Sequence, residues 1–103
     1  MSPTERCLRL CRERGWTAAV VERWIPGANV RRDLLGCIDI IACPPGGPVL
    51  GIQACAGSGH AAHAAKALAE PRLAAWLLAG AAFEVWSWSG RVGRTKAGKR
   101  ASR

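Results

Sequence analysis

The chain has 103 residues, a length that supports one domain with a modest hydrophobic core. Half of its residues are apolar and 21% are charged, a composition that excludes an intrinsically disordered protein. The net charge of +8 is concentrated at the C-terminus, because residues 91–103 hold six basic side chains and no acidic one. We therefore expect a single, nearly neutral domain at residues 1–90, followed by a flexible cationic tail.

The basic tail predicts a polyanionic partner. A cationic segment attached to a nearly neutral domain is typical of an arm that contacts phosphates. We expect the tail to bind nucleic acid through Arg91, Arg94, Lys96, Lys99 and Arg100. Two alternatives stay open: a tail that only keeps the protein soluble, and, less favoured, attraction to an anionic membrane, for which the tail lacks an apolar face.

The N-terminus has no signal-peptide core, and the longest apolar run, residues 73–83, is too short to span a bilayer. We therefore expect a cytoplasmic protein with no membrane partner. The five cysteines show no C-x-x-C spacing and are expected to be small buried apolar residues. An alternative is a zinc site formed by Cys7 and Cys11 on one helix with His60 and His63 further along the chain.

In chain order, residues 2–15 predict a helix, with Ser2 as the N-cap and Glu5 completing a capping box. Residues 16–25 are rich in β-branched and aromatic side chains and predict one strand. Residues 28–34 predict a polar connector. The first part of the chain is thus expected to contain one helix and one strand.

Two apolar segments, residues 34–43 and 48–55, predict central strands joined by a Pro/Gly turn. An Ala-rich helix with Ser58 as its cap is expected next, broken at Pro71, and residues 82–89 predict the last strand. This order, αβββαβ, requires a crossover connection before the last strand. It predicts an α/β fold with a mixed sheet flanked by helices.

Each central strand carries one polar side chain, Asp39 in the first and Gln53 in the second. If the strands pair as a hairpin, the two side chains lie near the same end of the sheet and can share one pocket. Carboxylate and amide oxygens are ligands for Mg²⁺, which would polarise a phosphodiester and activate a water molecule. The alternative is that both side chains only bond to nearby backbone groups.

The segments GCIDIIA and LGIQAC resemble the aspartate strand and the (D/E)-x-K strand of the PD-(D/E)XK nuclease superfamily. The resemblance covers residues 2–89 in element order and is strongest to small archaeal-type Holliday junction resolvases and their phage-encoded relatives. It implies a restriction-endonuclease-like fold with Mg²⁺, or Mn²⁺ as a substitute, bound by Asp39 and Gln53. Glu5 resembles the helix glutamate of the resolvase branch. Related resolvases work as dimers, so the resemblance allows a homodimer.

Two positions depart from the family pattern, Ile38 in place of proline and Cys55 in place of lysine. A neutral thiol cannot stabilise the charge that develops on a phosphate during cleavage. Lys66, which follows His60 and His63 at three-residue steps, is a candidate replacement cation. The alternative is that all three belong to the exposed face of an amphipathic helix.

Further charged side chains lie near the aspartate strand. Arg31 and Arg32 precede it and are expected to clamp phosphates at the rim of the site. Glu22 and Asp33 are additional carboxylates that could join a metal site, although their spacing does not single them out.

The five tryptophans divide into two groups. Trp16, Trp24 and Trp76 are expected to pack in the core. Trp86 and Trp88 share one face of the last strand, next to the basic tail, where they could stack on bases.

The sequence therefore predicts a nucleic-acid-binding α/β domain, with DNA as the expected partner. As an enzyme it would be a Mg²⁺-dependent endonuclease that hydrolyses phosphodiester bonds through Asp39, Gln53, Lys66 and Glu5. One alternative is a DNA-binding or regulatory module that kept the nuclease fold and lost catalysis. Another is an interaction protein whose basic tail contacts an acidic protein.

Overall fold

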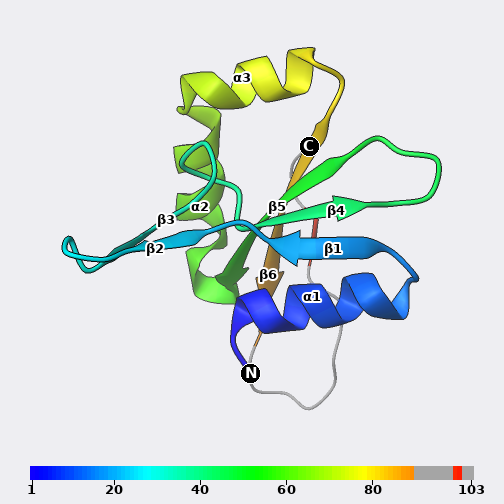
Figure 1. Cartoon of the computed structure of the whole chain (residues 1–103), viewed down its shortest axis with the longest axis horizontal. Coiled ribbons are helices and arrows are strands. Elements are labelled where there is room, and N and C mark those ends of the chain that lie inside the picture. The colour runs from blue at the N-terminus through cyan, green and yellow to red at the C-terminus, as the bar shows by residue number, and fades with distance from the viewer. Residues whose placement is uncertain (90–98, 101–103) are drawn as a thin grey trace.

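A computed structural model describes residues 1–89 and the short strand at residues 99–100 (Figure 1). The elements are α1 (Pro3–Glu13), β1 (Thr17–Val20), β2 (Arg23–Ile25), β3 (Val30–Arg32), β4 (Ile40–Cys43), β5 (Leu50–Ala56), the 3-10 turn η1 (Gly57–Gly59), α2 (His60–Leu68), α3 (Pro71–Leu78), β6 (Ala82–Trp88) and β7 (Lys99–Arg100). Of the predicted nucleic-acid-binding tail, Arg91, Arg94 and Lys96 lie outside the described residues. The backbone of Lys99 and Arg100 pairs with β6.

The main sheet has five strands in the order β1-β4-β5-β6-β7. Strands β4 and β5 form an antiparallel hairpin, whereas β5 and β6 are parallel. The chain passes from β5 to β6 through α2 and α3, because parallel neighbours need a crossover connection. The predicted α/β fold with a mixed sheet and flanking helices is confirmed at this level.

Helix α1 forms as its sequence predicts. The backbone N–H of Glu5 donates to Ser2 Oγ at 3.1 Å, and the Glu5 carboxylate accepts from the Ser2 backbone N–H at 2.8 Å. This capping box satisfies two of the N–H groups that a helix start leaves without partners. The chain turns out of the helix at Gly15, whose φ of 78° suits glycine.

Helices cover both faces of the sheet, and the core is therefore divided into two parts. Side chains of β5 alternate between them: Ile52 and Ala54 pack with Cys7 and Cys11 of α1. Cys55 packs on the opposite face with residues of α2, α3 and β6. The β4–β5 hairpin thus crosses the molecule between two apolar layers.

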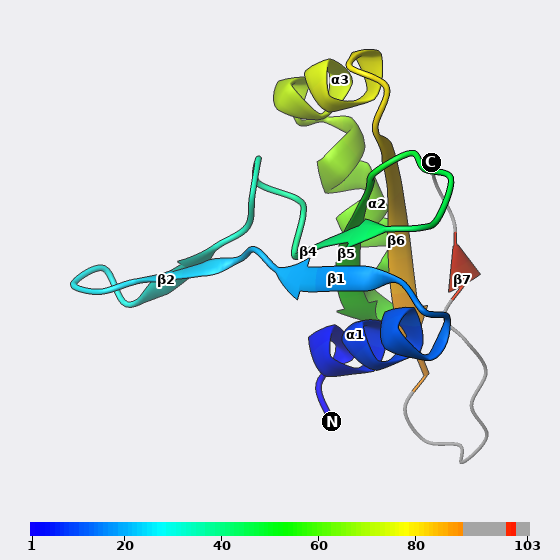
Figure 2. The same ribbon diagram turned by 45° about the vertical axis from the view of Figure 1, so that its right-hand side comes forward.

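Residues 16–25 do not form the single strand predicted from the sequence. The chain leaves the main sheet after β1, where the backbone N–H of Val21 donates to the carbonyl of Asp39 at 2.8 Å. It continues as β2, which pairs with β3 in a separate two-stranded sheet. The predicted polar connector at residues 28–34 was therefore wrong in part, because it contains β3. Figures 1 and 2 show this β2–β3 hairpin extending away from the main sheet.

The helices after β5 also differ from prediction in one detail. Helix α2 has Gly59 at its N-cap and no side-chain cap, because η1 occupies the residues around Ser58. Helix α3 begins at Pro71 as predicted, and its N-cap side chain, Glu70, accepts from the backbone N–H of Arg72 at 3.1 Å. None of the helices within the described residues has the length and apolar character needed to cross a membrane.

Candidate functional site

A cavity of about 810 Å³ opens where the two apolar layers end. It is bounded by the first turn of α1, the β2–β3 hairpin, the start of α2 and the adjoining ends of β4 and β5. Asp39 and Gln53 both line it, together with Glu5. The structure therefore brings three of the four predicted catalytic residues to one cavity.

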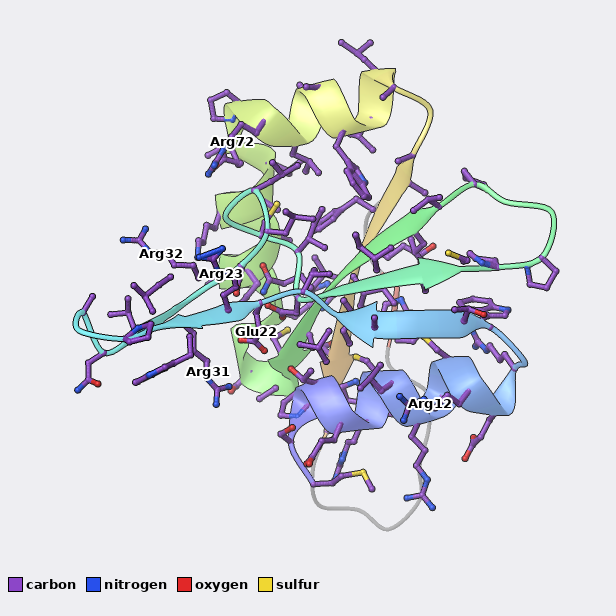
Figure 3. All side chains as sticks on the ribbon, viewed as in Figure 1. Arg12, Glu22, Arg23, Arg31, Arg32 and Arg72 are labelled. Carbon is purple, nitrogen blue, oxygen red and sulfur yellow. The ribbon has the colours of Figure 1, made fainter. Side chains whose placement is uncertain are left out.

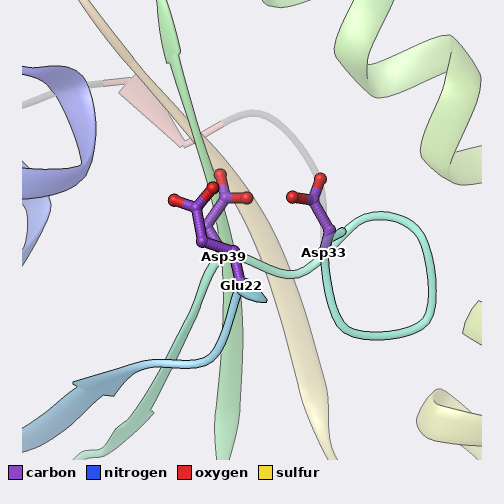
Figure 4. Close-up of side chains that lie close together, drawn as sticks. All are labelled: Glu22, Asp33 and Asp39. Atoms are coloured by element: carbon purple, nitrogen blue, oxygen red, sulfur yellow. The ribbon is translucent and has the colours of Figure 1, made fainter. Parts of the chain in front are cut away.

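Three carboxylates converge in this cavity: Glu22, Asp33 and Asp39, called here the acidic triad. One oxygen from each lies within 4.8 Å of the other two. They come from separate places in the chain, the junction of β1 and β2, the end of β3 and the start of β4. Figure 4 shows the Asp33 carboxylate directed toward those of Glu22 and Asp39.

The backbone holds two members of the triad firmly. Asp39 donates from its N–H to the carbonyl of Ile52 at 2.9 Å and accepts from Val21 at 2.8 Å. Asp33 and Asp39 flank a tight loop, in which Leu34 and Ile38 exchange two backbone hydrogen bonds of 2.9 Å. The separation between the two aspartates is therefore fixed by a closed turn rather than by a free loop.

Gln53 is paired with the triad through its amide nitrogen. Nε2 donates to Asp39 Oδ2 at 3.0 Å and to Asp33 Oδ2 at 3.4 Å. The Ala54 backbone N–H also donates to Asp39 Oδ2, at 2.8 Å. The predicted convergence of Asp39 and Gln53 is thus present, and so is a backbone contact of the kind that the alternative proposed. Gln53 Oε1 is buried without a hydrogen-bond partner among the described residues.

The environment of Asp39 favours its protonated form. The pKa of Asp39 is raised to about 7, mainly because the side chain is buried and only 5% exposed. Hydrogen bonding with Asp33 and the negative charges of Asp33 and Glu22 contribute to this rise, while the Ala54 N–H opposes it. A cation bound among the three carboxylates would favour the ionised form of Asp39 and so lower its pKa again.

The residues present fit a divalent cation. Ligands on opposite sides of one octahedral Mg²⁺ lie about 4.2 Å apart, which the spacing of the triad accommodates. Carboxylate oxygens are hard donors of the type that Mg²⁺ and Mn²⁺ bind. Gln53 turns its nitrogen toward the carboxylates in this structure, so its unpartnered Oε1 would have to rotate to become a ligand.

Glu5 and Lys66, the other predicted catalytic residues, lie in different surroundings. The Glu5 carboxylate is engaged in the capping box, whose hydrogen bonds from Ser2 lower its pKa. Lys66 is exposed on α2 and is not among the described residues that line the cavity. His63, from the same helix, does line it, with Nδ1 3.2 Å from the Gly59 carbonyl oxygen.

Cys55, at the position of the family lysine, is a core residue. Its side chain is 4% exposed and packs between the sheet and helices α2 and α3. Burial is the main cause that raises the pKa of this thiol, so it stays neutral at physiological pH. Cys55 therefore cannot supply a charge to the cavity.

The predicted zinc alternative is wrong for the part of the chain that the structure describes. Cys7 and Cys11 are buried against the sheet, and Cys7 Sγ accepts from Trp88 Nε1 at 3.2 Å. His60 instead bonds through Nδ1 to Ser87 Oγ at 2.9 Å. Among the described residues, the acidic triad is the one group of three or more such side chains close enough to share a metal ion.

The two predicted phosphate-clamping arginines lie on opposite faces of the hairpin. Arg31 lines the cavity and forms an ion pair with Glu22 at 3.8 Å. Arg32 lies opposite Arg23 in the strand register and points to the other face (Figure 3). Only Arg31 is therefore positioned at the rim of the acidic triad.

The tryptophans differ from expectation in two cases. Trp86, a predicted base-stacking residue, is 1% exposed, and its Nε1 donates to Glu84 Oε1 at 2.8 Å. Trp24, a predicted core residue, is 54% exposed and lines the cavity. Trp88 packs partly buried against the α1 side of the core. The exposed aromatic group near the site is thus on the hairpin and not on β6.

The comparisons with known proteins give no relative: no protein-family model matches the chain, and no curated protein or solved structure matches it either.

Proposed function

We propose that this protein binds DNA and hydrolyses its phosphodiester bonds with a divalent cation, Mg²⁺ or Mn²⁺, held at the acidic triad. The observation that carries the proposal is the meeting of Glu22, Asp33 and Asp39 in one cavity, with the unpartnered oxygen of Gln53 beside them. A restriction-endonuclease-like fold is part of the proposal. It is supported by the hairpin that pairs Asp39 with Gln53 and by the crossover to the parallel strand β6.

Each residue of the site has a distinct task in this proposal. The triad holds the cation, and the N–H groups of Gln53 and Ala54 fix the orientation of the Asp39 carboxylate. When bound, the cation polarises a phosphoryl oxygen and lowers the pKa of a water molecule. Arg31 at the rim attracts the DNA phosphates that flank the cut.

His63 replaces Lys66 in the proposed site. It lines the cavity from α2, whereas Lys66 does not. If Nδ1 donates to the Gly59 carbonyl oxygen, then Nε2 is free to accept a proton from water or to donate, once protonated, to a phosphate. This assignment places a titratable group near the cut without the family lysine.

A second candidate function is DNA binding without cleavage. It is favoured by the burial of Cys55, which leaves the family lysine position without a cation. The exposed position of Lys66 outside the cavity favours it as well. In that case the triad would serve structure or cation-dependent binding.

Cleavage of supercoiled plasmid in Mg²⁺ or Mn²⁺ tests the first candidate directly. We expect the wild-type chain to nick or linearise the plasmid and EDTA to stop it. Asp39→Asn, which removes one triad charge at nearly constant volume, should lower the rate by at least about 100-fold, as loss of a metal ligand does.

Arg12→Ala is the matched control for this assay. Arg12 is exposed on α1 and lies away from the hairpin in Figure 3, so its loss should leave cleavage unchanged. Equal cleavage by wild type and Asp39→Asn would contradict the nuclease proposal. DNA binding by a wild-type chain that cuts in neither metal would support the second candidate instead.

A further inference from the structure

The β2–β3 hairpin has two chemically different faces. In its register Trp24 lies opposite Arg31, and Arg23 lies opposite Arg32. Directly opposite residues of an antiparallel pair share a face, so these two pairs project to opposite sides of the ribbon. Figure 3 shows Arg23 and Arg32 on one side and Arg31 on the other.

The face with Trp24 and Arg31 is turned toward the acidic triad, because both residues line the same cavity as Asp39. Trp24 is 54% exposed, although a tryptophan in a folded protein is usually well buried. An exposed indole beside a guanidinium offers a flat apolar surface next to a positive charge. That combination suits a nucleotide, which has a flat base and an anionic phosphate.

On the other face, the positive charges of Arg23 and Arg32 lie opposite each other. Like charges that lie directly opposite on a ribbon repel each other. Both side chains are exposed, and within residues 1–89 neither forms an ion pair. A phosphate bound between them would remove this repulsion, so this face complements a polyanion.

We propose that the β2–β3 hairpin binds an unpaired nucleotide of DNA beside the cavity that holds the acidic triad, with Trp24 stacked on the base of that nucleotide. Arg31 contacts a phosphate next to that nucleotide, and Arg23 and Arg32 contact the strand on the outer face. The proposal rests on the nucleic-acid binding proposed above and not on cleavage. The substrate class would be DNA with a single-stranded end, flap or bulge.

The unpaired state follows from the geometry of stacking. Inside a duplex both faces of each base are covered by neighbouring bases, so an indole has no free face to contact except at the terminal base pairs. An unpaired base exposes that face, and stacking on an aromatic side chain is then sequence-tolerant. A duplex would use only the arginines of the hairpin.

Binding measurements with two DNAs test the proposal. One is a blunt duplex, and the other has the same sequence with a single-stranded extension; both carry a fluorescent label for anisotropy. The full chain with Asp39→Asn serves as the background, so that no DNA is cut. Adding Trp24→Ala should weaken binding to the extended DNA about tenfold and binding to the blunt duplex by less than about twofold.

Two further variants separate stacking by an aromatic ring from the loss of a positive charge. Trp24→Phe keeps an aromatic face and should retain most of the preference for the extended DNA. Arg12→Ala removes one positive charge far from the hairpin and should affect both DNAs alike. Quenching of tryptophan fluorescence by the single-stranded extension should be smaller in Trp24→Ala than in the background chain.

One outcome would overturn the inference: a ratio of the two affinities that Trp24→Ala leaves unchanged, either because neither DNA loses affinity or because both lose it equally. A wild-type chain that fails to cut while Trp24→Ala loses the preference would contradict the proposed cleavage and leave the hairpin inference standing. Binding of neither DNA at low salt would contradict both.

Discussion

The main sheet and the β2–β3 hairpin differ in what supports them. Strand β5 is buried along almost its whole length, and its side chains pack into two apolar layers. Strands β2 and β3 are mostly exposed, and among the strands that the structure describes they pair only with each other. The sheet is stabilised by burial, whereas the hairpin depends on its own hydrogen bonds and on its connections to the sheet.

This difference divides the site into two kinds of components. Asp39 and Gln53 lie where the sheet holds them, buried and hydrogen-bonded to each other. Trp24, Arg31 and Arg32 lie on the exposed ribbon. A cation needs ligands at fixed positions, whereas a strand of DNA is better met by side chains that can adjust. The arrangement therefore agrees with the proposal of a metal site on the sheet and a nucleic-acid contact on the hairpin.

Replacing one tryptophan in each region with alanine should give the largest difference in the free energy of unfolding. Trp86→Ala deletes a side chain that is 1% exposed and should lower the free energy of unfolding by about 3–5 kcal/mol. Trp24→Ala deletes one that is 54% exposed and should cost less than about 1 kcal/mol. Urea unfolding of both variants measures the difference. Similar losses in the two would show that the hairpin is as firmly packed as the sheet.

The buried carboxylate of the sheet should make stability depend on pH. The pKa of Asp39 is raised to about 7, so between about pH 4 and pH 7 the unfolded chain releases this proton while the folded chain keeps it. The contribution of Asp39 to stability therefore falls as pH rises through this window and is constant above it. One pKa unit corresponds to about 1.4 kcal/mol, so the total is a few kcal/mol.

Asp39→Asn removes this titration. In EDTA the variant should be more stable than wild type at about pH 8 by up to a few kcal/mol, and the difference should shrink toward about pH 4. Thermal unfolding at both pH values measures it. A stability difference that is the same at both would mean that Asp39 is not held in its protonated form at neutral pH.

The ion pair between the exposed Arg31 of the hairpin and the largely buried Glu22 should have the smallest effect on stability. Arg31 lies 3.8 Å from Glu22 and its side chain is 68% exposed, so Arg31→Ala should change the free energy of unfolding by less than about 1 kcal/mol. The same variant should reduce the salt dependence of DNA affinity by about one phosphate contact. Arg12→Ala is the control. If Arg31→Ala leaves the salt dependence of DNA affinity unchanged, Arg31 does not contact DNA phosphate.

The elements predicted correctly from the sequence are those set by local signals. The capping box of Ser2 and Glu5 defines the start of α1, and Pro71 defines the start of α3. The apolar runs on either side of the Pro/Gly turn define the β4–β5 hairpin, and this spacing was enough to place Asp39 beside Gln53. Periodicity and capping act within a few residues and can be read from one chain.

The hairpin has a local turn, in which the Asn29 N–H donates to the Ile25 carbonyl, but the point where the chain leaves the main sheet is not set locally. Nothing in residues 16–25 marks a break, and the chain turns away where Val21 bonds to Asp39, which is far along the sequence. Glu22 reaches the triad only because of that turn. The position of Asp33 could have been predicted from the sequence. Its backbone carbonyl accepts a hydrogen bond from the Gly36 N–H, and a turn predicted at these residues would have placed Asp33 near Asp39.

Gly36, in the loop between Asp33 and Asp39, lies close to side chains at the start of helix α3. A Cβ added at Gly36 would lie 2.9 Å from Glu70 Oε1 and 3.0 Å from Arg72 Nη2. These two side chains are joined by hydrogen bonds of 2.8 Å and 3.0 Å. Any larger residue at position 36 would meet this pair, so the residues at the start of α3 restrict which side chain the loop between the two aspartates can carry, although none of α3 lies on the cavity wall.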